Sequence, residues 1–283
     1  FVDLNWVGAE TGPLIIVLHG LEGSVKSKYA ARILARIASQ GWGGVLMHFR
    51  GCSGELNLRD RSYHSGDTGD FRFLLSVLTE RYPQRQLMAV GYSLGGNVLL
   101  KYLGESADDS ALSSAAAISV PFDLAAGATR LNCGFSKIYQ RRLVASLQNK
   151  VRLKFANRPP PMPLDKLSQW TDFWSFDNYV TAPLHGFRNA EEYYRRSSCR
   201  QFLGAIATRT LIIHSRDDPF LTPEAIPTPA ELSATTTLLL TERGGHVGFV
   251  GGRLPYNPHY WIDDQLIAWF NVDGAKHHAY NIA

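Results

Sequence analysis

Cysteine is scarce in this sequence. Only three of the 283 residues are cysteines, Cys52, Cys133 and Cys199, and they lie far apart. An odd number at such spacing predicts neither a disulfide framework nor a zinc site, and it favours a reducing compartment. We therefore expect a cytoplasmic protein without a structural metal ion.

Long apolar runs are also missing. The best runs, residues 14–18 and 237–240, fall well short of the roughly 18 consecutive apolar residues that a membrane-spanning helix needs. Their lengths suit buried strands, so we expect no stable membrane insertion in this segment. The chain starts at Phe1, inside a strand-like alternation and without an initiator Met. We expect that a segment has been trimmed ahead of it, in which an anchor could lie.

Charge of one sign is not in large excess. Lysine and arginine total 29 against 25 acidic residues, which gives a net charge of +4, and the basic residues form no long run. This balance argues against nucleic acid as a partner. Hydrophobic residues make up 45% of the chain, enough to bury a substantial core, which excludes disordered and fibrous classes.

The sequence does contain short apolar runs that alternate with helix-length periodic segments, a pattern typical of parallel βαβ units. The predicted strands are 14–19, 44–50, 86–91, 115–120, 210–215 and 235–241, and the predicted helices are 26–40, 67–82, 94–104 and 259–270. Between the predicted strands 115–120 and 210–215, residues 122–200 have a helical pattern, many basic residues and several prolines. We predict one α/β domain over residues 1–283, with a mostly parallel sheet flanked by helices. Its core is 1–121 and 201–283, and its helical cap insertion is about 122–200.

A candidate nucleophile lies directly after the third predicted strand. The run Gly91-Tyr92-Ser93-Leu94-Gly95 has the G-x-S-x-G pattern between a strand and a helix. So tight a turn presses the residues on either side against backbone, which explains why both are glycine. The turn would present the serine hydroxyl above the sheet, and the following helix would direct its N-terminal amides at an anion forming there.

An acid and a base follow in the chain order that this kind of serine site requires, Ser, Asp, His. Asp217 and Asp218 follow the strand 210–215, and His246 follows the strand 235–241. Spacing does not separate the two neighbouring aspartates.

A candidate oxyanion hole lies in the loop that leaves the first core strand. The run Leu18-His19-Gly20-Leu21 would place the backbone N–H of Leu21 beside that of Leu94, and such preorganised donors stabilise a developing negative charge. We expect His19 to brace this loop by a hydrogen bond rather than to act as the base.

These motifs resemble those of the α/β-hydrolase superfamily, and more narrowly of its YheT-like branch of esterases, related to the ABHD1/ABHD3 and EMB8-like groups. The resemblance covers essentially the whole chain and rests on four runs: Leu18–Ser24, Phe49–Glu55, Gly91–Asn97 and Asp217–Phe220. It implies an α/β-hydrolase fold with Ser93 as nucleophile, His246 as base and Asp218 as acid, because the acid of similar hydrolases immediately precedes the proline or its equivalent. Asp123, just after the strand that ends at residue 120, is a rival acid of lower rank, because some members of the superfamily place theirs there. One departure is His48, where similar proteins more often have Asn or Asp, and we expect it to tune the loop that carries Arg50.

The implied activity is hydrolysis of carboxylic esters, with short- to medium-chain acyl groups or lipids, through an acyl-enzyme and without a metal or organic cofactor. Two alternatives stay open: acyl transfer to an alcohol, for which His259…Asp264 forms an H-x4-D string, and ligand binding without turnover.

The predicted cap carries many aromatic and basic side chains. For most of the aromatic ones we expect packing of the cap rather than an acyl pocket, and for the basic ones a solvated helix face rather than a phosphate or lipid contact. These residues are Phe135, Tyr139, Phe155, Trp170, Phe173 and Trp174, and Lys137, Arg141, Arg142, Lys150, Arg152 and Lys154.

Overall fold

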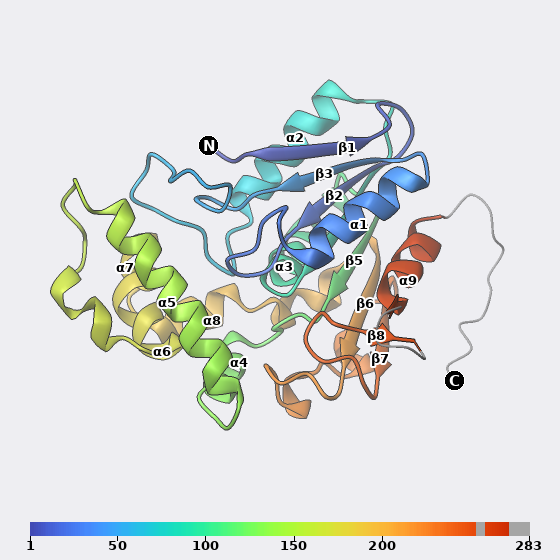
Figure 1. The fold of residues 1–283 in the computed structure, drawn as a ribbon. Coiled ribbons are helices and arrows are strands. Elements are labelled where there is room, and N and C mark those ends of the chain that lie inside the picture. The colour runs from blue at the N-terminus through green and yellow to red at the C-terminus, as the bar shows by residue number, and fades with distance from the viewer. Residues whose placement is uncertain (253–257, 272–283) are drawn as a thin grey trace.

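A computed structural model describes residues 1–252 and 258–271. These residues form a seven-stranded sheet of order β1-β3-β2-β4-β5-β6-β7, in which β1 is antiparallel to β3 and every other neighbouring pair is parallel (Figure 1). The strands are β1 (Leu4–Gly8), β2 (Leu14–Leu18), β3 (Gly43–Met47), β4 (Leu87–Tyr92), β5 (Ser114–Ile118), β6 (Arg209–Ser215) and β7 (Thr236–Thr241). The predicted α/β class with a mostly parallel sheet is confirmed.

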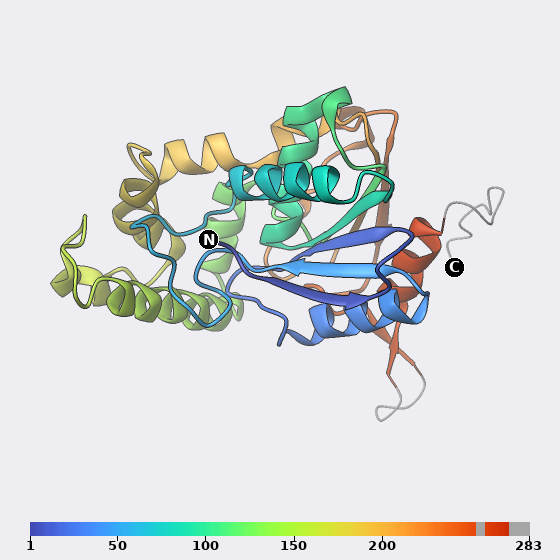
Figure 2. The same cartoon turned by 90° about the horizontal axis from the view of Figure 1, so that it is seen from above.

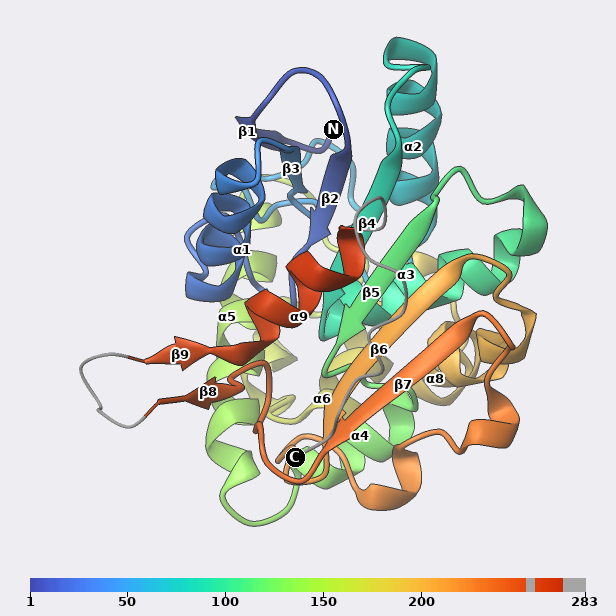
Figure 3. The same cartoon turned by 90° about the vertical axis from the view of Figure 1, so that its right-hand side faces the viewer.

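Helices cover both faces of the sheet (Figure 3). Helices α1 (Lys28–Ser39) and α9 (Trp261–Phe270) pack on one face, and α2 (Gly69–Arg81) and α3 (Leu94–Ser106) on the other. Strand β2 shows why the sequence contains unbroken apolar runs: Ile15 and Val17 pack on the α1 side, whereas Ile16 packs on the α2 side. A strand buried on both faces has no polar side.

The chain between β5 and β6 is mostly helical and lies beside the carboxyl ends of the strands (Figures 1 and 2). It contains α4 (Leu124–Leu131), α5 (Ser136–Lys154), α6 (Phe173–Phe176), a π-helical turn (Asp177–Thr181), α7 (Ala182–His185) and α8 (Ala190–Ser197). One apolar cluster, which includes Val144, Phe155 and Trp170, packs α5, α6 and α7 together, and a second joins α4 to α8 through Leu124 and Tyr193.

Several predicted elements reach one to three residues beyond the observed ones. The strand predicted to reach Arg50 ends at Met47. The helix predicted from His259 begins at Trp261, because His259 and Tyr260 form strand β9 (His259–Tyr260), which pairs with β8 (Val250–Gly251). In the described part of the chain no helix is both long and apolar enough to cross a membrane.

Candidate active site

Ser93 lies on a tight turn between β4 and α3. Its backbone has φ 51° and ψ −116°, a region that costs energy for any residue with a Cβ atom. The turn is possible because its neighbours are small: a Cβ on Gly91 would lie 2.5 Å from the Gly95 carbonyl oxygen, and one on Gly95 would lie 2.5 Å from the Leu18 carbonyl oxygen. The two glycines of the motif are therefore required by close backbone approach.

The structure brings Ser93, His246 and Asp218 together in one chain of hydrogen bonds. The Ser93 hydroxyl lies 2.9 Å from His246 Nε2, and His246 Nδ1 lies 2.8 Å from Asp218 Oδ2. Because a carboxylate only accepts, Nδ1 donates to Asp218, which leaves Nε2 free to accept from the serine. The Phe220 ring stacks on the imidazole with ring centroids 4.0 Å apart, so contacts with the acid and with this ring fix the orientation of His246.

The three candidate acids occupy different environments. Asp218 is buried, and its second oxygen accepts from the backbone N–H of Phe220 at 2.9 Å. Asp217 points to the loop that carries the histidine, where its Oδ1 accepts from the N–H groups of Gly244 and Gly245 at 2.9 and 2.8 Å. Burial opposes ionisation of Asp217, but these hydrogen bonds outweigh it and the pKa of its carboxyl lies below the usual value. Asp123 caps the N-terminus of α4 and accepts from Ala126 N–H at 3.0 Å.

Positive backbone φ angles gather in the loops around this site. Besides Ser93, most non-glycine residues with positive φ follow three other strands of the sheet: Glu22 after β2, Ser119 after β5, and Val247 and Phe249 after β7. Ala107, at the end of α3, is the exception among the described residues. The Ser119 hydroxyl accepts from Val247 N–H at 3.0 Å and so ties two of these loops together. Strain of this kind persists only where the surrounding contacts impose it, and it is common at functional sites.

The loop after β2 is held rigidly beside Ser93. His19 is fully buried; its Nδ1 lies 2.7 Å from the Gly20 carbonyl and donates to it, while its Nε2 accepts from Phe49 N–H at 3.1 Å. Burial lowers the pKa of His19 to about 4, so the ring is neutral and serves as a brace. The amides of the residues around Leu21 donate to protein oxygens, whereas Leu21 itself lines the pocket beside Ser93 and Leu94. Leu94 is the first residue of α3, where a backbone N–H has no partner within the helix.

His48 and the H-x4-D string lie away from the reacting groups. His48 Nε2 lies 2.6 Å from Asn5 Oδ1, which links the start of the Arg50 loop to the edge strand β1. His259 Nε2 lies 2.7 Å from Asp264 Oδ2, both side chains are exposed, and Asp264 also pairs with Arg36 on α1. Neither His259 nor Asp264 lines the pocket that contains Ser93.

A largely apolar pocket opens from Ser93 into the helical insertion. The six cap aromatics divide between this pocket, the interior of the insertion and its surface. Phe173 lines the pocket, Phe155 and Trp170 pack inside the insertion, Trp174 Nε1 donates to the Thr129 hydroxyl at 3.1 Å, and Phe135 and Tyr139 are exposed.

The same pocket contains a buried carboxyl, Asp177. It accepts from the hydroxyls of Thr181 at 2.5 Å and Tyr194 at 2.7 Å. Burial raises the pKa of Asp177 to about 6. Both of its oxygens are therefore engaged by neutral donors of the insertion itself.

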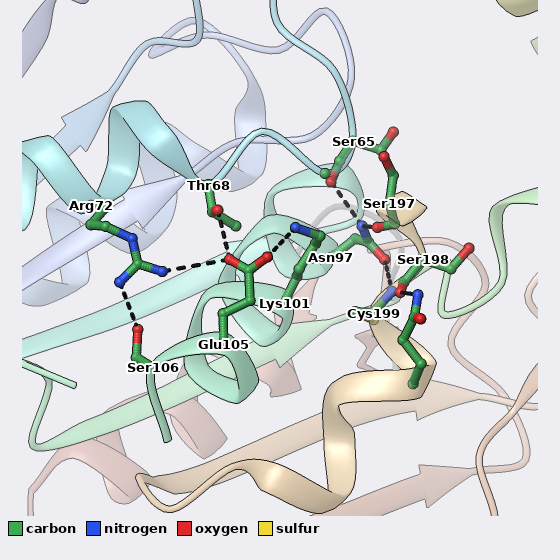
Figure 4. A network of polar contacts seen from close by, with 12 residues as sticks. Ser65, Thr68, Arg72, Asn97, Lys101, Glu105, Ser106, Ser197, Ser198 and Cys199 are labelled. Atoms are coloured by element: carbon green, nitrogen blue, oxygen red, sulfur yellow. Dashed lines mark hydrogen bonds and ion pairs between the residues drawn. The ribbon is translucent and has the colours of Figure 1, made fainter. Parts of the chain in front are cut away.

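Asn97, in the first turn of α3, ties the insertion to the Ser93 turn (Figure 4). Its amide nitrogen donates to the carbonyls of Ser65 and Ser197 at 2.8 Å each, and its oxygen accepts from Cys199 N–H at 3.0 Å. The side chain is fully buried and all three hydrogen bonds are to backbone. Sequence reasoning placed Asn97 in the serine motif but gave it no role, because its partners lie between 32 and 102 positions away.

Among the residues that the structure describes, no group of His, Cys, Asp and Glu side chains could hold a metal ion.

Comparisons with known proteins agree on one fold family. The model of the alpha/beta hydrolase fold family matches residues 13–252. The Escherichia coli protein named "Putative esterase YheT" is 41% identical over 278 residues, which cover 96% of this chain and 82% of that protein. "Monoacylglycerol lipase" of Saccharomyces cerevisiae is 31% identical (92% of this chain, 59% of that protein), and mouse "Phospholipase ABHD3" is 29% identical (88% and 61%).

This chain therefore spans about three fifths of the length of the yeast and mouse relatives. Among solved structures, the Pyrococcus furiosus esterase Pf2001 superposes with a TM-score of 0.60 at 14% identity, covering 95% of this chain and 89% of that one. At this identity the likeness shows the fold alone.

Proposed function

Because the chain belongs to the α/β-hydrolase fold family, and its relatives include proteins named as esterases and lipases, we propose that it hydrolyses carboxylic esters with Ser93, His246 and Asp218 as a catalytic triad. The observation that carries the proposal is the hydrogen-bond chain through both nitrogens of one imidazole, 2.9 Å to Ser93 and 2.8 Å to Asp218. The substrates are esters of short- to medium-chain acids or lipid esters, since the pocket beside Ser93 is mainly apolar.

In the proposed reaction the Ser93 oxygen attacks the ester carbonyl while His246 Nε2 takes the hydroxyl proton. Asp218 holds the imidazole in the tautomer that can accept this proton and stabilises the imidazolium that forms. His246 then donates the proton to the leaving alcohol, and an acyl-enzyme remains on Ser93. A water molecule, deprotonated by His246, releases the acid and restores the serine.

The backbone N–H groups of Leu21 and Leu94 are the proposed oxyanion hole. Two features support this role. Leu94 is the first residue of helix α3, so its backbone N–H is one of the free N-terminal amides that directly follow Ser93. The loop that carries Leu21 is held in place by hydrogen bonds of His19 and Tyr29. Donors that are already held in place need no reorganisation when the negative charge develops, and each such donor contributes roughly 2.7–4 kcal/mol in known cases.

The test is labelling of the protein by a fluorophosphonate probe, together with hydrolysis of p-nitrophenyl esters from acetate to dodecanoate. We expect the wild type to label and to hydrolyse, and Ser93→Ala to fail in both, with kcat lower by on the order of a million-fold. If folded wild type neither labels nor hydrolyses any of the esters, the proposal is wrong and the chain binds a ligand without turnover.

A further inference from the structure

The basic residues of the insertion do not share one environment. Lys137, Arg141, Arg142 and Arg152 are exposed, as a solvated helix face predicts. That interpretation is wrong for the other two. Lys150 is half-buried and its Nζ donates to Glu22 Oε1 at 2.6 Å, so its charge is paired. Lys154, the last residue of α5, is only 5% exposed.

The ammonium of Lys154 is bound by neutral groups. Its Nζ donates to Asn57 Oδ1 at 2.5 Å and to the Arg61 carbonyl at 3.0 Å, both neutral oxygens. Among the described residues no carboxylate comes within ion-pair distance of it. An ammonium has three donors and two are used. Burial lowers the pKa of Lys154 to about 8, so the group is still mostly charged at neutral pH, in a place where an unpaired charge is costly.

Lys154 lines the same pocket as Ser93, at a different end. The start of α5 lies beside the Asp218 loop, where the Ser136 hydroxyl donates to the Pro219 carbonyl at 2.8 Å. Lys154 ends the same helix, about 27 Å further along at 1.5 Å per residue. Between them Leu143, Leu147 and Val151 line the pocket together with Lys150, whose charge is paired with Glu22. The last lining residue of this helix is Lys154.

The loop that buries Lys154 belongs to the core rather than to the insertion. Figures 1 and 2 show α5 running out from the core beside the light blue loop between β3 and α2. Asn57 and Arg61, which accept from the ammonium, belong to this loop. The far end of the pocket is therefore built where the two parts of the molecule meet.

Two imidazoles of the same pocket add further donors: His185 lies close enough to Lys154 for its protonation to be disfavoured by the lysine charge as well as by burial, and His64 packs against His185. Their ring centroids lie 4.6 Å apart. His64 Nδ1 accepts from Gly66 N–H at 3.1 Å, so the proton of the neutral ring is on Nε2. Within the described chain neither this Nε2 nor the ring of His185 has a hydrogen-bond partner. Asp177, a carboxyl of the same pocket, is already bound by two hydroxyls.

We propose that the end of the pocket formed by Lys154, His64 and His185 binds an anionic group, a carboxylate or a phosphate, that the ester substrate carries away from its scissile bond. The ammonium supplies the charge and the imidazoles supply neutral donors. The proposal rests on the ester hydrolysis proposed above and names a substrate class for it. The competing explanation is that Lys154 only holds the loop of Asn57 and Arg61 against α5.

Matched pairs of esters separate the two explanations. The acyl side is tested with the mono-p-nitrophenyl ester of octanedioic acid against p-nitrophenyl octanoate, and the alcohol side with octanoyl glycerol phosphate against octanoyl glycerol. We expect the wild type to prefer the anionic member of at least one pair by about tenfold or more in kcat/KM, the effect of one charge-assisted hydrogen bond. The pair that shows the preference identifies which side of the ester carries the anion.

Substitution then assigns the preference to Lys154. In Lys154→Met the ratio of anionic to neutral kcat/KM should fall to near one, whereas Arg152→Met, which removes an exposed charge from the same helix, should keep the wild-type ratio. The proposal is overturned if Lys154→Met lowers kcat/KM equally for the anionic and the neutral ester. It is also overturned if the wild type shows no preference for the anionic ester in either pair. If Lys154→Met does not fold, Lys154→Gln keeps a donor for Asn57 and Arg61 and lacks only the charge.

A binding measurement on Ser93→Ala keeps this proposal separate from the proposed activity. The binding of octyl phosphate, octanoate and 1-octanol is measured by calorimetry. Tighter binding of either anion than of the alcohol, lost on adding Lys154→Met, supports the anion site even if no ester is hydrolysed. Equal binding of all three overturns it, whatever the enzyme hydrolyses.

Discussion

Two identical neighbours, Asp217 and Asp218, illustrate how single residues acquire their roles in this molecule. Asp218 is buried and contacts His246. Asp217 accepts hydrogen bonds from two backbone N–H groups of the loop that carries His246. One carboxylate contacts the imidazole, and the other shapes the loop that presents it. Their effects on the reaction should therefore differ greatly.

Asp218→Asn should lower kcat by about four orders of magnitude, because an amide in that position favours the wrong tautomer of the histidine. Asp217→Asn keeps an oxygen that can accept from Gly244 and Gly245 and should cost less than about tenfold, the loss of a charge from hydrogen bonds that remain. Both are measured on one p-nitrophenyl ester under saturating conditions. Equal losses in the two variants would contradict the assignment of Asp218 as the acid.

At the scale of elements, helix α4 begins where the insertion leaves the sheet, and its first turn is closed by the side chain of Asp123. The residue follows β5 and was a lower-ranked candidate for the acid, yet its Oδ1 accepts from Ala126 N–H. An aspartate at this point of a helix satisfies one of the free amide groups and complements the helix dipole.

Asp123→Ala should therefore lower the free energy of unfolding by about 1 kcal/mol and leave kcat/KM within a few-fold of wild type. Urea denaturation and ester hydrolysis measure the two quantities on the same preparation. A thousand-fold loss in kcat with unchanged stability would instead make Asp123 part of the catalytic machinery.

At the scale of the whole molecule, the insertion is joined to the core through a few buried contacts. Its two ends meet where Leu124 N–H donates to the Ser198 hydroxyl and Arg200 N–H donates to the Phe122 carbonyl. Asn97 then connects its exit to the helix that follows Ser93 (Figure 4). Asn97 thus ties the pocket wall to the helix of the nucleophile, in addition to the contacts that Ser136, Lys150 and Lys154 make with the core.

Asn97→Ala should leave three buried backbone groups without partners and lower the free energy of unfolding by at least about 2 kcal/mol. Asn149→Ala, at an exposed position on α5, is the matched control and should change stability by less than about 0.5 kcal/mol. Chemical denaturation measures the free energy of unfolding of both variants and of the wild type. Similar stabilities of the two variants would mean that Asn97 does not stabilise the junction of insertion and core.

Much of the fold was predictable because its signals are local. The apolar runs of β2, β4 and β6 and the periodicity of α1 and α2 mark their elements to within one or two residues at each end. The β8–β9 pairing was missed, since a two-residue strand has no pattern of its own and depends on a partner strand elsewhere in the chain. The environment of Lys154 was misjudged for a similar reason: the groups that bury it come from the loop near Asn57, 97 positions earlier.

The sequence by itself determined the order of strands and helices, the glycine turn around Ser93, and the succession of serine, aspartate and histidine at strand ends. These depend on residue size, on periodicity and on chain order, which can be recognised from the sequence itself. Tertiary structure alone decided that Asn97 binds three distant backbone groups, that Asp123 caps a helix, and that one lysine of a basic helix lies buried between neutral oxygens in the pocket. Burial and pairing depend on neighbours distant in sequence, so a linear pattern does not contain them.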